Sequence, residues 1–112
     1  MSEKKPIVKV ILYKPKEAWY RLSSEKRVKF VNAIPDKQKE FGVKTLITSC
    51  KCFWSNEEWF GFAVEEYPDL ETLEKYNDWA VSAGWQRYYE SRVYLGPRIT
   101  AEEWKVYNTM SP

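Results

Sequence analysis

The chain has 112 residues, 44% of them apolar and 30% charged, which excludes a disordered chain and favours one globular domain over residues 1–112. Its net charge is +2, but the charges are unevenly distributed: residues 1–44 hold 12 Lys/Arg and 5 Asp/Glu, and residues 45–112 hold 6 Lys/Arg and 11 Asp/Glu. Because acidic residues interrupt the basic runs, we expect the charges to form solvated faces, and we expect no nucleic-acid binding. Without a run of about 18 apolar residues or a signal-peptide pattern, we expect no membrane partner and a cytoplasmic location.

Hydrophobic patterning divides the chain into strands and helices separated by turn residues. The predicted elements, in chain order, are a strand at 7–13, a loop at 14–22, a helix at 23–42, a strand at 43–54, a turn at 55–58, a strand at 59–67, a helix at 68–84, a strand at 87–96 and a short helix at 101–107.

Residues with helix-end preferences support these limits. Ser23 or Ser24 can cap the first helix and Thr100 the last, because a hydroxyl oxygen accepts from free amides of the first turn. Gly42 suits a left-handed helix end, and Pro35 should kink or split the first helix. The inner stripe of the second helix is predicted to comprise Leu70, Leu73, Tyr76 or Asn77, and Ala80.

The order β-α-β-β-α-β predicts an α+β, ferredoxin-like fold with helices on one face of an antiparallel sheet. Simple alternation along the 43–54 and 59–67 hairpin leaves apolar side chains on both faces. One face is predicted to carry Leu46, Thr48, Cys50, Cys52, Trp54, Trp59, Gly61, Ala63 and Glu65. A sheet that is apolar on both faces needs a second cover, and a second copy of the chain in a two-fold homodimer is the simplest one.

This element order, with the segments "YPDLETLEKYNDWAVSAGW" and "RYYESRVYLGPR", resembles the dimeric α/β-barrel superfamily over about residues 7–97. That superfamily includes cofactor-independent monooxygenases, haem-dependent chlorite dismutases and dye peroxidases, muconolactone isomerases and stress-response proteins. The resemblance implies a homodimer with a small-molecule cavity between sheet and helices, and a tail at 98–112. It does not select a reaction.

The two cysteines and the absence of histidine bear on metal and cofactor use. Cys50 and Cys52 would lie about 6.5–7 Å apart on one strand face, outside easy disulfide reach. The chain has no histidine, so a closed zinc site, histidine-ligated haem and histidine-dependent nucleophilic catalysis are not expected. We therefore predict no metal and no cofactor, with both thiols as small buried side chains; a redox role, helped by Arg92, stays an alternative.

Small residues and aromatics indicate where a ligand could bind. Gly61 and Ala63 leave space in mid-strand, which either a ligand or one of the 6 tryptophans would fill. The predicted ligand-binding residues are Tyr13, Trp19, Cys50, Cys52, Trp59, Gly61, Ala63 and Tyr88.

The catalytic candidates follow from the resemblance, because cofactor-free oxygenases of this superfamily orient a phenolic substrate with Asn, Trp, Tyr and Arg side chains. Here Arg92 could stabilise a substrate anion, Asn77 could hold an oxygen atom and Tyr94 could transfer a proton. As an alternative, Arg92 could form an ion pair with a glutamate on a neighbouring strand. The predicted function is binding of a small aromatic or hydrophobic molecule, with or without oxygenase or isomerase activity. The alternative is a non-catalytic structural or interaction protein whose aromatics form dimer or higher-order interfaces, with assembly beyond the dimer through Trp104 and Tyr107.

Overall fold

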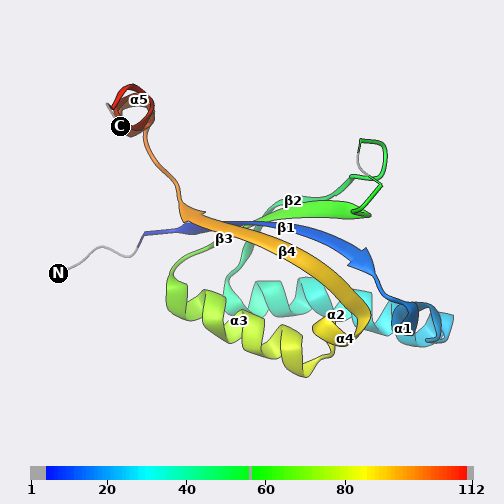
Figure 1. The fold of residues 1–112 in the computed structure, drawn as a ribbon. Helices are drawn as coiled ribbons and strands as arrows, with labels where there is room; N and C mark the ends of the chain where they lie inside the picture. Colours follow the sequence, from blue (N-terminus) through cyan, green and yellow to red (C-terminus); the bar gives the residue numbers. More distant parts are fainter. Residues whose placement is uncertain (1–4, 56, 111–112) are drawn as a thin grey trace.

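A computed structural model describes residues 5–55 and 57–110, which form one four-stranded antiparallel sheet in the order β2-β3-β1-β4. The elements are β1 Ile7–Pro15, α1 Glu17–Tyr20, α2 Ser24–Phe41, β2 Lys44–Lys51, β3 Gly61–Tyr67, α3 Leu70–Ser82, α4 Trp85–Tyr88, β4 Tyr89–Pro97 and α5 Ala101–Thr109. The two long helices α2 and α3 lie side by side on one face of the sheet (Figure 1). The predicted α+β, ferredoxin-like fold is confirmed.

The helix-end signals act as predicted, with one exception. Ser23 Oγ accepts from the Lys26 amide at 3.2 Å, Gly42 ends α2 with a φ of 75°, and Thr100 forms a capping box with Glu103 ahead of α5. Pro35 does not split α2, which is helical from Ser24 to Phe41. A proline removes a single N–H donor, and the remaining turns keep the helix continuous.

Three element limits differ from the sequence prediction. The predicted loop at 14–22 contains the short helix α1, and α4 precedes β4. The hairpin strands are shorter than predicted. The Cys52 amide still bonds across the hairpin to the Phe60 carbonyl, but the Ser55 amide then bonds back to the Cys52 carbonyl, so the chain turns from Cys52 on. β2 ends at Lys51 and β3 begins at Gly61, and the predicted turn at 55–58 includes residue 56, which lies outside the described residues.

The register of β2 against β3 overturns the predicted alternation of the hairpin. Thr45 pairs with Glu65, but two irregularities follow, and Cys50 pairs with Phe62. Lys51 is the β2 residue that pairs with Gly61, and neighbouring residues of a strand point to opposite faces. Cys50 thus lies on the face of Phe62, opposite the face that carries Gly61 and Ala63, so the prediction that these three share a face is wrong.

The helix layer packs against the sheet at two separate places. At one end lies a core cluster of Val43, Tyr67, Leu73 and Tyr76, with Ile7, Phe41 and Trp79 packed against it. At the other end lies an aromatic cluster of Tyr13, Trp19, Phe30, Trp85, Tyr88 and Tyr89, whose neighbouring ring centroids are 4.3–6.5 Å apart. Leu73 and Tyr76 confirm the predicted inner stripe of α3, whereas Leu70 is 57% exposed because it starts the helix.

The opposite face of the sheet, which we call the open face, is covered by none of the described helices. In Figure 1 α5 and the segment that directly follows β2 stand at its two ends, on the side away from α2 and α3. The radius of gyration is 16.4 Å, against about 13 Å expected for a compact domain of this length. The chain is a two-layer slab with a projecting terminal helix. No helix among the described residues is long and apolar enough to cross a membrane.

Candidate functional site

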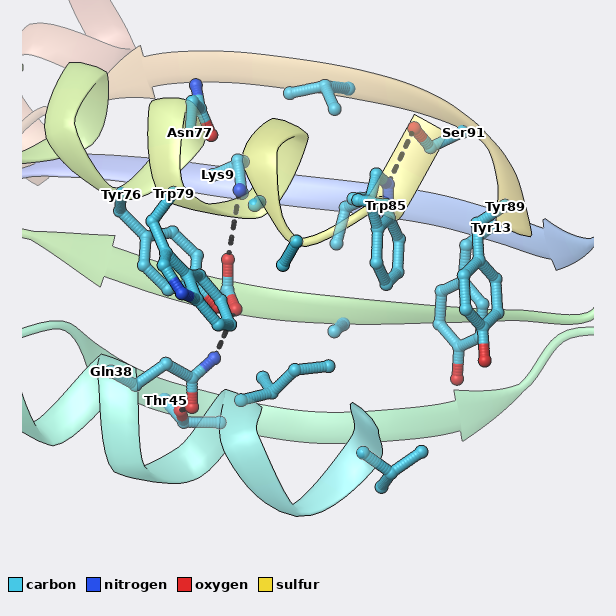
Figure 2. Close-up of a pocket in the computed structure, with 18 of the residues that line it drawn as sticks. Lys9, Tyr13, Gln38, Thr45, Tyr76, Asn77, Trp79, Trp85, Tyr89 and Ser91 are labelled. Carbon is cyan, nitrogen blue, oxygen red and sulfur yellow. Dashed lines mark hydrogen bonds and ion pairs between the residues drawn. The ribbon is translucent and has the colours of Figure 1, made fainter. Parts of the chain in front are cut away.

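A pocket of about 630 Å³ lies between the sheet and helices α2 and α3, between the core cluster and the aromatic cluster (Figure 2). Alternate residues of β1, β3 and β4 point into it, as the pleat of a strand requires. The sheet side of the pocket includes Lys9, Ile11, Tyr13, Ala63, Glu65, Ser91 and Val93. Phe30, Ile34 and Gln38 line it from α2, and Tyr76, Trp79 and Ala80 from α3.

One end of the pocket is a stack of aromatic rings. The Trp85 and Tyr89 rings lie 4.3 Å apart at 13° to each other, and the Tyr13 ring meets both edge-on. Trp85 Nε1 donates to Ser91 Oγ at 3.3 Å, and the hydroxyls of Tyr13 and Ser49 are hydrogen-bonded to each other. Burial raises the pKa of Tyr89 to about 12, so its hydroxyl stays neutral at ordinary pH. We call this the aromatic end.

Gly61 and Ala63 play different parts beside the aromatic end. A Cβ atom at Gly61 would lie 2.9 Å from the Tyr13 hydroxyl oxygen and 2.9 Å from the Cys50 carbonyl oxygen. The space that the missing side chain leaves is thus taken by Tyr13. Ala63, in contrast, borders the pocket itself. Of the two small residues, one allows a close approach within the protein and the other keeps the pocket open.

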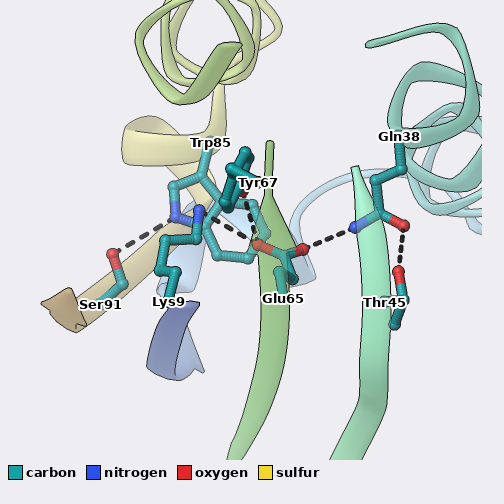
Figure 3. Close-up of polar contacts among 7 residues, drawn as sticks. All are labelled: Lys9, Gln38, Thr45, Glu65, Tyr67, Trp85 and Ser91. Carbon is teal, nitrogen blue, oxygen red and sulfur yellow. Dashed lines mark hydrogen bonds and ion pairs between the residues drawn. The ribbon is translucent and has the colours of Figure 1, made fainter. Parts of the chain in front are cut away.

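The other end of the pocket contains a buried ion pair (Figure 3). We call this ion pair and its hydrogen-bonding partners the polar end. Lys9 Nζ lies 3.2 Å from Glu65 Oε1, and the two residues are only 5% and 7% exposed. The Tyr67 hydroxyl donates to Glu65 Oε1 at 2.8 Å, and Gln38 Nε2 donates to Glu65 Oε2 at 2.6 Å. Thr45 Oγ1 in turn donates to Gln38 Oε1 at 2.9 Å.

Two tyrosine rings complete the polar end. Lys9 Nζ lies 5.2 Å from the centre of the Tyr67 ring and 5.4 Å from that of Tyr76, within cation–π range. Burial, and then the charge of Glu65, raise the pKa of both phenols far above the usual value. The tyrosines are therefore neutral hydrogen-bonding groups, and the charged atoms of the polar end belong to Lys9 and Glu65.

The structure brings together only some of the predicted ligand-binding residues. Tyr13 and Ala63 line the pocket. Trp19 and Tyr88 pack behind the aromatic end, where both contact the Phe30 ring. The remaining predicted residues do not line the pocket: Cys50, Cys52, Trp59 and Gly61. Cys50 is turned to the open face by the register of β2, and Trp59 lies beneath the Lys14 and Arg92 side chains, at 5.5 and 5.6 Å.

The three predicted catalytic residues do not form one site. Asn77 lines the pocket, but Arg92 and Tyr94 occupy the alternate positions of β4 and pair with Leu12 and Val10 on the open face. Since neighbouring residues of a strand point to opposite sides, Ser91 and Val93 enter the pocket and Arg92 and Tyr94 cannot. Arg92 and Tyr94 therefore do not share the pocket with Asn77, and the catalytic roles of the three residues stay predictions.

Sequence reasoning missed the residues that give the pocket its polarity. Lys9 and Glu65 pair directly across β1 and β3, the two central strands, and both point toward the helices. One feature of the sequence could have indicated them: Lys9 is the only charged residue in "IVKVILY" and alternates with Ile7 and Ile11, which point inward. A charge at such a position is rarely buried without a partner of opposite charge. Gln38 and Trp85 carried no comparable signal.

The cysteines and the acidic residues form no evident metal centre. Both thiols are free, with Cys52 buried and Cys50 half-buried. Within residues 5–55 and 57–110, no three Cys, Asp or Glu side chains gather closely enough to hold a metal ion. The pocket chemistry of the described residues thus rests on one ion pair, amides, hydroxyls and aromatic rings.

Comparison with known proteins identifies the fold. No protein-family model and no curated protein matches the chain. Among solved structures, one of a protein described as a candidate chlorite dismutase superposes with a TM-score of 0.68 at 13% identity. The match covers 92% of this chain and 48% of that one, so the chain spans about half of the neighbour's length. The chain therefore shares the ferredoxin-like α+β fold of that structure.

Proposed function

We propose that this protein binds a small, elongated and largely aromatic molecule in the pocket between the sheet and helices α2 and α3. The observation that carries the proposal is the pocket itself, which has about 630 Å³ of space between two well-packed clusters. Ligand sites fall in the range of roughly 300–1,000 Å³ and combine apolar walls with a few placed polar groups. This pocket has that composition, with rings at one end and the Lys9–Glu65 pair at the other.

The tryptophans support binding over self-filling of the space. Trp79 and Trp85 border the pocket and leave its volume open, while Trp19 and Trp59 are buried elsewhere. A void of this size within a helix–sheet interface costs stability, because its lining loses packing contacts. A bound molecule would restore those contacts.

Binding is better supported than catalysis. An oxygenase or isomerase reaction without metal or haem would have to use side chains that line the pocket. Among the residues predicted from the sequence, Asn77 and Tyr13 carry polar groups and line it. Lys9 and Glu65 are engaged with each other, and burial keeps Tyr67 and Tyr76 protonated. These contacts favour holding a ligand in one orientation over transferring its protons.

We further propose that the protein works as a homodimer joined through the open face. The supporting observation is the set of apolar side chains that alternate on that face: Val8, Val10, Leu12, Ile47, Phe62, Val64 and Tyr94. Of these, Ile47 and Tyr94 are 42% and 57% exposed in the isolated subunit. Two such faces pack at about 10 Å in sheet-on-sheet interfaces. Native mass spectrometry of freshly purified protein tests the dimer and any retained ligand together.

The pocket is tested with naphthalene as an apolar probe, followed by amide chemical shifts. We expect shifts at residues of β1, β3 and α3 that border the pocket. Ala63→Phe should fill the pocket and weaken binding by about tenfold or more. Ala101→Phe, on the exposed helix α5, is the matched control and should bind like the parent. Undiminished binding by Ala63→Phe would show that the probe sits elsewhere and would overturn the proposal.

A further inference from the structure

We infer that the polar end selects molecules that carry an oxygen acceptor (a carbonyl, phenolate or carboxylate) at one end of an aromatic body, and that Lys9 is the group that binds this oxygen. The inference rests on the proposed binding of an aromatic molecule and adds its polar group and its orientation. It follows from which atoms of the Lys9–Glu65 pair are already occupied.

The carboxylate of Glu65 is fully engaged by the protein. Its Oε1 accepts from Lys9 at 3.2 Å and from the Tyr67 hydroxyl at 2.8 Å, and its Oε2 accepts from Gln38 at 2.6 Å. Thr45 holds Gln38 in this position from β2. A carboxylate bound by donors from three directions is both satisfied and fixed in place, so Glu65 does not select for a donor on the ligand.

The ammonium group of Lys9 is the opposite case. It has three N–H donors, of which Glu65 takes one. Its ammonium group also faces the Tyr67 and Tyr76 rings, at 5.2 and 5.4 Å, and a ring face is a weaker partner than an oxygen atom. Lys9 also borders the pocket (Figure 2), so an oxygen acceptor that enters there can receive a charge-assisted hydrogen bond.

Stability alone does not explain this ion pair. Replacing a buried pair by apolar residues of similar size is often neutral or stabilising, because both charges lose their hydration on burial. Here the pair lies on the two central strands, where the inward neighbours Ile7, Ile11 and Ala63 are apolar. A charged pair that is costly in this place and borders a pocket is better explained by recognition of a ligand.

The spacing of the two ends sets the length of the ligand. Lys9 and Tyr13 both point into the pocket and are four residues apart on β1. At about 3.3 Å per residue, the polar and aromatic ends lie about 13 Å apart. A body of two or three fused rings with its oxygen at one tip spans that distance, with the rings against Trp85 and Tyr89.

Three probes with a common skeleton test the inference: naphthalene, 2-acetylnaphthalene and 2-naphthoate. In the unmodified protein the oxygen-bearing probes should bind about tenfold or more tightly than naphthalene, as one charge-assisted hydrogen bond implies. Lys9→Met/Glu65→Gln, which removes both charges together, should abolish the preference, so that the three probes bind this variant with similar affinity. Lys14→Met removes a lysine on the opposite side of β1, where it pairs with Glu90, and should keep the preference.

The outcomes separate the inference from the function on which it rests. Naphthalene that binds as tightly as the other two probes, or a double variant that keeps the preference, overturns the role of Lys9 and leaves the pocket standing. Failure of all three probes to bind overturns both. If 2-naphthoate binds more tightly than 2-acetylnaphthalene, the result supports an anionic oxygen on the ligand. If the two bind equally, the result supports recognition of a neutral carbonyl as well.

One measurement needs no variant, should the double substitution fail to fold. In the unmodified protein, nuclear Overhauser effects should connect the methyl group of 2-acetylnaphthalene with the Tyr76 ring at the polar end. The ring protons farthest from the acetyl group should contact the Trp85 indole at the aromatic end. The reverse orientation, with the methyl group against Trp85, would overturn the inference.

Discussion

The two faces of the sheet are similarly rich in apolar residues but differ in where their charged residues lie. Both carry apolar residues at most positions of β1 and β3. On the helix-covered face the charges lie at the centre, where Lys9 and Glu65 are buried beside the pocket. On the open face the centre is apolar and the charges lie toward its ends, as in the ion pairs Lys14–Glu90 at 3.5 Å and Arg98–Glu66 at 2.9 Å.

This difference indicates two kinds of contact. An apolar centre with a charged rim is the arrangement of protein–protein interfaces. A charged group among apolar and aromatic walls is the arrangement of small-molecule sites. The sheet thus presents one face suited to a second protein surface and one suited to a ligand.

The largest effect is expected from an unpaired charge on the covered face. Lys9→Ala leaves Glu65 buried without its cation and should destabilise the protein by about 3–5 kcal/mol. Lys14→Ala, on the open side of the same strand, removes half of a more exposed pair and should cost less than about 1 kcal/mol. Urea unfolding at one fixed protein concentration measures both. Equal losses would show that the buried pair has no special weight.

The next effect concerns the open face and association of subunits. Tyr94→Asp places a charge in the proposed interface and should weaken dimerisation by more than about a hundredfold, since an unpaired buried charge costs about 3 kcal/mol or more. Leu70→Asp is the control, because Leu70 is equally exposed but starts α3 on the covered side. Sedimentation equilibrium measures the constant. A monomeric parent protein at micromolar concentration would contradict the dimer.

The covered face should also respond to alkaline pH. Burial raises the pKa of Tyr67, Tyr76 and Tyr89 above the reference value of 10.0. Their contribution to stability is fully present below pH 10 and is lost as pH rises toward the folded-state pKa, about 12 for Tyr89.

We expect cooperative unfolding above pH 10, with these three phenols ionising as the fold is lost. Absorbance at 295 nm, recorded together with circular dichroism, follows both events. Tyr67→Phe should flatten the loss of stability above pH 10. Complete ionisation of all 8 tyrosines in a still folded protein would contradict the expected burial.

The smallest effect distinguishes two glycines of the sheet. Gly61→Ala brings a Cβ atom to 2.9 Å from Tyr13 and from the Cys50 carbonyl, so we expect a loss of about 1–3 kcal/mol from overpacking. Gly96→Ala meets no atom within 4 Å and should be neutral or slightly stabilising. Thermal unfolding compares the two. A neutral Gly61→Ala would mean that Tyr13 moves aside easily and that the aromatic end is not rigid.

Much of the fold could be predicted from local signals. Ser23 and Thr100 mark helix starts because their hydroxyl oxygens accept from unpaired backbone amides. Gly42 marks a helix end because it adopts the left-handed conformation in which its own amide bonds to carbonyls of the last turn. The element order then limits the topology to the observed one. The alternation of β1 also indicated an apolar open face, because a pleated strand shows both its faces in sequence.

The site was only partly predictable, since it depends on which strand positions face the same side. Tyr13, Ala63 and Asn77 were predicted and line the pocket. Arg92 and Tyr94 were chosen by residue type, and the register of β4 places both on the open face.

The sequence by itself determined the helix ends, the element order and the apolar character of both sheet faces, because these depend on nearby residues and on spacing. Only the tertiary structure decided that Cys50 pairs with Phe62 and so faces away from Gly61, and that Lys9 meets Glu65 beside an open pocket. Strand register and the distance between layers arise from contacts between residues far apart in the chain, and no local pattern records them.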